Sequence, residues 1–455
     1  MEKMGLKHRR NIMLNLTILF LFSLSLYGCG FKDVEKSEEN VNSELVDTSV
    51  IGPNLLEDYE SLEIRDIDNV RGNLQLPLEG SNGSKITWVS EKPTIISDKE
   101  IVNDSYDNTP IGVVHRQDTD VDVVLTANLT LDDESIQKKF IATVKAKYVL
   151  DTLTDYIFTY FTGDGKGQES IHFAASKDGF SYKELNYNKP IIESVLGTRG
   201  LRDPFILRSK EGDKFYMIAT DLCIANDGDW WKAQSSGSTS IMIWESYDLV
   251  NWSEQRMVKV NSDMAGCTWA PEAYYDDITG EYLVFFASRV KSDNYSKQRV
   301  YYTKTRDFYT FTEPKIWIDY EFSTIDTTVV KDNDMYYRFT KYEEKSTIIL
   351  EKADSLLGTW TRINSTSLED QEGVEGPYCF LLNEEDVYEG KKWALLLDKY
   401  GSTGYYLMVT DNLDKALFEK KKGYKLPSVK PRHGTVMAIT SDEYTRLMKV
   451  YTIQK

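Results

Sequence analysis

Five short phrases of the sequence share one pattern, beginning with "SKDGFSY" at Ser176–Tyr182. Each phrase places an aspartate after a Ser, Thr or Ala neighbourhood and an aromatic residue a few positions later. The aspartates lie 47 to 70 residues apart, which leaves room for about four strands in each repeat. A repeat of this length predicts an all-β protein built as a five-bladed β-propeller. The other four phrases are "SYDLVNW" (246–252), "TRDFYTF" (305–311), "KADSLLGTW" (352–360) and "TDNLDKALF" (410–418).

A second repeat marks the innermost strand that should open each blade. Each aspartate phrase is expected to end one blade and lead into the opener of the next. The fifth opener, "RHGTVMAIT" (432–440), stands near the C-terminus with no blade after it, whereas "YIFTYFTG" (156–163) begins a blade that has no opener. We therefore predict that residues 435–439 pair with 156–161 and close the ring without a free sheet edge. The other four openers are "RDPFILRS" (202–209), "WAPEAYYD" (269–276), "IDTTVVKD" (325–332) and "EGPYCFLL" (375–382).

Polar side chains stand at the beginning of these openers. Innermost strands of a propeller begin around its central channel, so their first residues should converge at one end of the axis. Three carboxylates in one depression repel one another and separate their pKa values, as acid and base catalysis at one pH requires. The residues expected to meet are Asp203, Trp269, Asp326, Glu375 and His433.

The ordered motifs "RDP", "WAP", "IDT", "EGP" and "RHG" resemble those of glycoside hydrolase family 43, over about residues 148–455. The resemblance implies a five-bladed propeller that cleaves arabinose or xylose from plant polysaccharides with inversion. It implies that Asp203 is the general base and Glu375 the general acid, and that Asp326 tunes the acid and orients the sugar. Thr327 departs from the pattern, because proline is commoner there. Glu272 in "WAPE" is the competing candidate for the acid.

The chemistry of inversion agrees with these roles. A glycosidic oxygen leaves readily only when it is protonated, so Glu375 must carry a proton and Asp203 must be ionised to accept one from water. Inverting enzymes keep the two carboxyl groups about 6.5–9.5 Å apart, a gap that different blades across a channel can provide.

Further residues, with Glu272 among them, are expected to contact substrate or metal. Arg202 and Arg338 are candidates for hydrogen bonds to sugar hydroxyls, with pairing to a carboxylate as the alternative. Trp269, and Trp230 and Trp231 in the insertion "CIANDGDWWKAQSSGSTS", are candidates for stacking on a sugar, with core packing as the alternative for the last two. In many members of the resembled family the residue matching His433 faces a calcium ion in the channel, and one calcium ion is the cofactor expected here. No organic cofactor is expected.

The N-terminal region carries export signals. A basic stretch (7–10), an apolar run (12–26) and "LYGC" (Leu26–Cys29) predict a signal peptide over residues 1–28. "LYGC" resembles the lipobox of bacterial lipoproteins, which implies acylation of Cys29 and attachment to the bacterial cell surface. An ordinary cleaved signal is the alternative. Residues 29–54 are polar and acidic and are predicted to be a disordered tether.

Residues 55–147 alternate apolar and polar positions in short segments, as in "KITWVS" and "VDVVLTANLTL", and predict a small β-sandwich. The segment resembles the atrophied Ig-like modules that precede sugar-cleaving domains in bacterial surface enzymes. Its expected role is spacing, and the catalytic domain follows over 148–455. The presence of "YFTG" after this module points to the branch of the family that contains bacterial α-L-arabinofuranosidases.

Charge and cysteine usage exclude other classes. The 455 residues include 54 basic and 72 acidic side chains, a net charge of −18 that would repel nucleic acid. Cys223, Cys267 and Cys379 have neither metal-type spacing nor an even number, so they are expected in the core.

Three functions remain open beside α-L-arabinofuranosidase action on arabinan or arabinoxylan. β-Xylosidase or endo-arabinanase activity would use the same three carboxylates with different loops. A carbohydrate-binding surface propeller without catalysis is the third, and retention of all three carboxylates counts against it. Fructan cleavage is disfavoured because the expected Asn-Asp-Pro motif is absent from the sequence.

Overall fold

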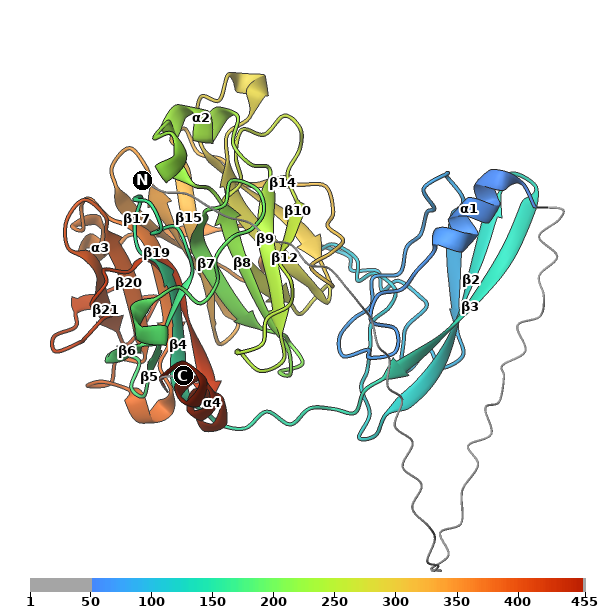
Figure 1. Ribbon diagram of the computed structural model, residues 1–455, viewed down its shortest axis with the longest axis horizontal. Coiled ribbons are helices and arrows are strands. Elements are labelled where there is room, and N and C mark those ends of the chain that lie inside the picture. Colours follow the sequence, from blue (N-terminus) through green and yellow to red (C-terminus); the bar gives the residue numbers. More distant parts are fainter. Residues whose placement is uncertain (1–50, 453–455) are drawn as a thin grey trace, which may run out of the picture. The chain divides into compact units, whose positions relative to one another are not determined.

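The computed structural model describes residues 51–452, which belong to one compact unit of the chain (Figure 1). Its N-terminal module contains the helix α1 (Pro53–Ser61) and one antiparallel sheet in the order β1-β2-β3. The strands are β1 (Lys85–Ser90), β2 (Val121–Leu131) and β3 (Glu134–Val144). Alternate residues of β1 and β2 are buried, and they form one core with residues of α1.

The module has less sheet than the predicted sandwich. Opposite the three-stranded sheet, the described residues form isolated bridges such as Ile96 with Val114 and Ile101 with Thr109. The stretch between them is rich in Asn, Asp, Pro and Gly, which disfavour continuous strands. The module is therefore a reduced form of the predicted sandwich, with one complete sheet and isolated bridges opposite it.

The rest of the described chain forms five sheets of four antiparallel strands each, the five blades that the repeats predicted. Blade 1 contains β7 (Leu201–Arg208), β8 (Phe215–Asp221), β9 (Ser240–Ser246) and β10 (Arg256–Lys259); blade 2 contains β11 (Trp269–Asp276), β12 (Glu281–Ser288), β13 (Arg299–Thr305) and β14 (Lys315–Ile318). Blade 3 contains β15 (Thr324–Asp332), β16 (Met335–Tyr342), β17 (Thr347–Ala353) and β18 (Thr361–Ile363); blade 4 contains β19 (Glu375–Leu381), β20 (Trp393–Lys399), β21 (Gly404–Thr410) and β22 (Glu419–Lys420). Blade 5 contains β23 (Arg432–Thr440), β4 (Leu153–Phe161), β5 (His172–Ser176) and β6 (Tyr182–Glu184).

Short helices connect these strands at several places. The helices α2 (Trp230–Ser235) and α3 (Thr366–Glu369) precede β9 and β19, and α4 (Ser441–Thr452) follows β23. Figure 1 shows α4 beside β4 and β5, which it contacts. The 3-10 turns are η2 (Asn186–Asn188), η3 (Ile224–Asn226), η4 (Lys291–Asp293) and η5 (Glu384–Asp386).

The last strand closes the ring as predicted. In β23, Thr435 pairs with Thr159 of β4 and Ile439 with Asp155. Each innermost strand contacts the innermost strand of the next blade, and β23 contacts β7 of the first. The N-terminal and C-terminal strands of the propeller therefore share blade 5, and its inner edge is covered.

The five aspartate phrases lie one strand earlier than predicted. Each forms the turn between the third and fourth strands of its blade instead of the passage to the next blade. In the first phrase Asp178 Oδ1 accepts bonds from the backbone N–H groups of Phe180 and Ser181. Asp248 and Asp307 make the matching bonds in blades 1 and 2. In these three blades the repeat thus reports a local Asx-type turn, which the sequence pattern cannot place within or between blades.

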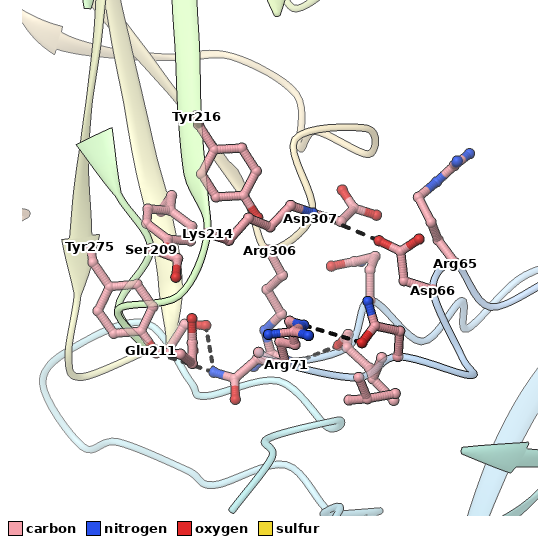
Figure 2. A pocket seen from close by; sticks show the side chains of 18 of the residues that line it. Arg65, Asp66, Arg71, Ser209, Glu211, Lys214, Tyr216, Tyr275, Arg306 and Asp307 are labelled. Atoms are coloured by element: carbon pink, nitrogen blue, oxygen red, sulfur yellow. Dashed lines mark hydrogen bonds and ion pairs between the residues drawn. The ribbon is translucent and has the colours of Figure 1, made fainter. Parts of the chain in front are cut away.

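The N-terminal module contacts the propeller at the hairpin turns of blades 1 and 2, near the ends of β7 and β11. Asp213 Oδ2 accepts bonds from Arg71 Nη1 at 2.8 Å and Arg116 Nη2 at 2.9 Å. The guanidinium of buried Arg306 donates to the backbone carbonyls of Leu74, Pro110 and Ile111. Figure 2 shows the polar residues of both sides around a cavity of about 70 Å³. We call this contact the module dock.

Candidate active site

All five innermost strands begin with the same irregularity. Each carries one extra residue relative to its neighbouring strand, a β-bulge, within two or three residues of its start. The bulged residues of blades 1 to 4 have left-handed backbones, with φ of 48° at Asp203, 47° at Ala270, 52° at Asp326 and 51° at Gly376. His433 occupies the bulge of blade 5. The motifs "DP", "AP", "DT", "GP" and "HG" are therefore one structural device repeated five times.

The bulges bring the predicted residues together. His433 Nδ1 lies 3.3 Å from Asp203 Oδ1 and 3.7 Å from Asp326 Oδ1, so the imidazole lies against carboxylates of two other blades. Gly376 is required beside it: its φ is positive, and a Cβ there would stand 2.7 Å from Cγ of His433. The backbone N–H of Gly376 donates to Asp326 Oδ2 at 3.0 Å. Four blades thus meet at one cluster.

Asp203 is held in the ionised form. Burial acts to raise its pKa, but contact with His433 and the charges of His433 and Arg202 outweigh burial and lower the pKa below 3.8. Its Oδ2 accepts a bond from Thr220 Oγ1 at 2.9 Å, and the same hydroxyl accepts from the N–H of Ala270. The carboxylate is fixed between blades 1 and 2.

The pKa values of Asp326 and His433 are both raised above their ordinary values. Burial, with the charges of Glu375 and Asp203, raises the pKa of Asp326 to about 6 against the opposing charge of His433. Burial acts to lower the pKa of His433, but Asp326 and Asp203 raise it to about 9. Around neutral pH the cluster contains a protonated imidazole beside an ionised Asp203, while Asp326 is close to its titration point.

Glu375 stands one residue before its bulge and has different partners. Its Oε2 accepts from Lys341 Nζ at 2.9 Å and its Oε1 from Arg432 Nη2 at 2.6 Å. Arg432 also donates to buried Asp398. The side chain of Glu375 is 18% exposed, more than the side chains of Asp203 and Asp326. Glu375 is the carboxyl group of this cluster most open to a substrate.

Glu272 lies deeper in the channel, two residues after Ala270 on β11. It is buried, and burial raises its pKa to about 8. A neutral carboxyl group at this depth fits a structural role within the channel, because the group is closed off from solvent.

The two predicted arginines lie in different places. Arg202 precedes the bulge of blade 1 and is buried between Asp164 and Glu169, at 2.6 and 3.2 Å. Arg338 lies outside the cluster: it pairs with Glu351 at 2.7 Å, and its guanidinium lies over the rings of Trp317 and Trp360. Both therefore make the carboxylate pairs that were the alternative to sugar binding.

The three tryptophans form an exposed edge beside Arg202. Trp230 and Trp231 on α2 are 42% and 57% exposed, so neither is a core residue. Trp269 is half-buried, and the ring of Trp230 meets it edge to face with centroids 6.1 Å apart. The guanidinium of Arg202 lies 5.3 Å from the Trp230 ring.

A metal site is less evident than the carboxylate cluster. Within residues 51–452, no group of three or more His, Cys, Asp or Glu side chains is arranged to hold a metal ion. His433 has Asp203 and Asp326 against Nδ1, and its raised pKa opposes metal binding by that nitrogen. A calcium ion held by one imidazole and water stays a prediction.

Sequence reasoning missed several residues of the site. Lys341 and Asp398 lie on second strands, opposite Ile325 and Glu375, and nothing in their local sequence marks them. Arg432 belongs to the quoted "RHG" motif, which was a usable signal. Asp164 and Glu169 lie in the loop between β4 and β5 and hold Arg202.

Comparison with known families identifies the chain. A model described as a probable glycosyl hydrolase domain, related to glycoside hydrolase family 43, matches residues 151–445, and one described as an atrophied bacterial Ig domain matches 55–147. The chain belongs to this family of probable glycosyl hydrolases, with an Ig-like module ahead of the propeller. The resemblance stated from the motifs is confirmed.

A curated relative narrows the comparison. An α-L-arabinofuranosidase of Bifidobacterium longum subsp. longum is 34% identical over 385 residues, which cover 72% of this chain and 36% of the relative. The chain therefore spans about a third of the length of that relative.

Solved structures of low identity are also similar. A β-1,3-galactosidase of family 43 with galactodeoxynojirimycin is 12% identical with a TM-score of 0.42, covering 73% of this chain and all of that one. An α-L-arabinofuranosidase of Podospora anserina in complex with cellotriose is 14% identical with a TM-score of 0.33, covering 50% of this chain and 69% of that one. The family assignment rests on the sequence matches alone.

Proposed function

We propose that the protein is an inverting α-L-arabinofuranosidase that releases arabinose from arabinan or arabinoxylan. The observation that carries the proposal is the meeting of Asp203, Asp326 and Glu375, from three blades, around the bulges that begin the innermost strands. The curated relative with the same named activity supports the choice of sugar.

The proposed base is Asp203. It is ionised at neutral pH because its pKa is lowered, and Thr220 and His433 fix its orientation. An ionised, fixed carboxylate can take a proton from a water molecule as that water attacks the anomeric carbon. Asp203 becomes ionised again when it releases this proton to solvent.

The proposed acid is Glu375, which must carry a proton when the substrate is bound. Lys341 and Arg432 hold its two oxygens in the free protein, and a substrate must displace one of these bonds to bring the glycosidic oxygen within reach. The exposure of Glu375 supports this role over buried Glu272. The pKa of Asp326 is raised to about 6, in part by the charge of Glu375. Asp326 is proposed to adjust the charge around Glu375 while the acid donates its proton.

Two further parts of the proposal concern the N-terminal region and a metal ion in the channel. Export and lipid attachment through Cys29 are proposed from "LYGC", which lies outside the described residues. From residue 51 to 452 no helix has the length and apolar character needed to span a membrane. One channel calcium ion near His433 is proposed, and no catalytic step above passes through it.

The test is hydrolysis of aryl glycosides by the full chain. We expect release from an aryl α-L-arabinofuranoside, little from an aryl β-D-xyloside, and NMR detection of the inverted anomer as first product. Asp203→Ala should lose this activity and regain part of it with azide and an activated substrate. A retained anomer would overturn the mechanism, preference for xyloside would change the sugar, and polysaccharide binding without any hydrolysis would favour a non-catalytic propeller.

A further inference from the structure

The insertion between β8 and β9 of blade 1 is anchored to the active site. Glu169 Oε1 accepts from the N–H of Ile224 at 2.8 Å, and Oε2 accepts from that of Ala225 at 3.1 Å. The same carboxylate bonds Arg202, the residue next to Asp203. At the far end of the insertion, Gly237 N–H donates to the carbonyl of Gly266 at 2.7 Å. The insertion is thus held at both ends, and its helix α2 stands at the edge of the propeller in Figure 1.

A cavity of about 430 Å³ lies between this insertion, the turn before β7 and the strand β10. We call it the blade 1 pocket. Leu222, Ile224 and Ala233 form a small apolar cluster, and Trp269 packs against it. Because Trp269 also begins the inner strand of blade 2, the blade 1 pocket adjoins the candidate active site. Its volume lies within the range of small-molecule sites, about 300–1,000 Å³.

The polar lining of the pocket selects a ligand rich in hydroxyl donors. Asp221 is 3% exposed; its Oδ1 accepts from the backbone and hydroxyl of Thr198, while Oδ2 has no hydrogen-bond partner among the described residues. Asp227 and Asp229 add two acceptors, and Asp227 pairs with the one lining lysine, Lys232. Three carboxylates against one ammonium disfavour an anionic ligand. An aromatic ring beside carboxylates that can accept hydrogen bonds from hydroxyl groups favours a neutral sugar.

We propose that the blade 1 pocket binds a neutral sugar residue of the polysaccharide chain, at a distance from the bond that is cut. The inference rests on the proposed function and deepens it. It assigns the insertion, which contributes none of the three carboxylates, to recognition of polymer over small glycosides. The exposed rings of Trp230 and Trp231 extend the same edge of the molecule and provide further apolar surface for the chain.

The test is Met257→Trp in the full chain. Met257 is 43% exposed and lines the pocket, so a larger side chain obstructs the pocket without removing any described hydrogen bond. The matched control is Met264→Trp, which is 48% exposed and outside the lining. We expect Met257→Trp to lower kcat/KM on a long arabino-oligosaccharide about tenfold, the equivalent of about 1.4 kcal/mol. Its kcat/KM on an aryl arabinofuranoside should change less than about twofold, a free-energy change of about 0.4 kcal/mol, and the control should change neither.

A second measurement separates this inference from the proposed function. Arabino-oligosaccharide is titrated calorimetrically into three proteins that all carry Asp203→Ala: this variant alone, and the variant combined with Met257→Trp or with Met264→Trp. Because Asp203→Ala prevents turnover, the titration measures binding alone. Weaker binding by Met257→Trp alone supports the pocket even if wild type cleaves no aryl arabinofuranoside. Equal binding by all three proteins, or equal losses on the short and long substrates, would overturn it.

Discussion

The two ends of the innermost strands use similar side chains in different ways. At the site end, one imidazole serves two carboxylates, and Asp326 and Glu272 have raised pKa values of about 6 and 8. At the module dock, Asp213 has two arginines, and Arg306 has backbone carbonyls on several sides. The strand β7 has 8 residues, so about 25 Å separates its ends.

This difference teaches where stability and function are located. Charges that share too few partners have shifted pKa values, and such groups are typical of catalytic sites. At the module dock, the charged groups bind groups of opposite charge or backbone carbonyls, which holds the contact in place. The Ig-like module, expected from sequence only as a spacer, contributes partners that the hairpin turns of blades 1 and 2 use. We therefore expect substitutions at the two ends to separate activity from stability.

The largest effect is expected at the site end, for Glu375→Ala. Loss of a general acid costs about 10²–10⁴-fold in rate, and the loss should be much smaller for an aryl leaving group that departs as a stable anion. Glu272→Gln is the matched control, because it lies in the channel but is buried. Rates on arabinan and on an activated aryl arabinofuranoside measure the difference. If Glu272→Gln shows the leaving-group dependence and Glu375→Ala does not, the acid lies on blade 2.

The sequence predicted the ring and its carboxylates better than their surroundings. Ring closure followed because "RHGTVMAIT" matched the other openers, and each opener placed its functional residue on its bulge or one residue before it. Lys341 and Arg338 show the limit. Three residues apart on β16, they point to opposite faces because strand side chains alternate, and only the register opposite Ile325 brings Lys341 to Glu375. Sequence alone cannot choose between those faces when both are buried.

The next largest effect is expected at the module dock, for Arg306→Ala. The change leaves the carbonyls of Leu74, Pro110 and Ile111 without their Arg306 donor, which we expect to cost about 3–5 kcal/mol in free energy of unfolding. Activity per folded molecule should stay near wild type. Chemical unfolding of the full chain measures the loss, and exposed Arg362→Ala serves as control. An unchanged unfolding midpoint would show that the dock adds no stability.

A pH-dependent effect is expected from His172, near the site end of β5. The imidazole is buried, stacks on Tyr160 and has no hydrogen-bond partner among the described residues, and burial lowers its pKa from 6.5 to about 4. The unfolded chain takes up a proton below pH 6.5 while the folded protein does not, so stability falls from pH 6.5 down to about 4.

His172→Phe keeps an aromatic ring opposite Tyr160 and removes this titration. At pH 5 we expect the variant to lose less stability than wild type, by about 2 kcal/mol from the shift of about 1.4 kcal/mol per pH unit. Between pH 7 and 8 the difference between the two proteins should be constant. Denaturant unfolding across this pH range provides the measurement, and parallel stability curves for the two proteins would contradict the assigned titration.

The smallest effect is expected for Arg71→Ala in the module dock, where two arginines share Asp213. Arg71 is 30% exposed and Arg116 8% exposed at the side chain, although their distances to Asp213 Oδ2 are nearly equal. Water screens the Arg71 pair more, so Arg71→Ala should cost about 0.5–1 kcal/mol in free energy of unfolding. Arg116 also donates to the backbone carbonyls of Lys145 and Ala146, and those acceptors would lose their donor, so Arg116→Ala should cost about 2–3 kcal/mol. The pair of variants compares an exposed and a buried bond to one carboxylate. Equal losses would mean that the Asp213 contact alone sets the strength of the dock, and that the backbone bonds of Arg116 add nothing to it.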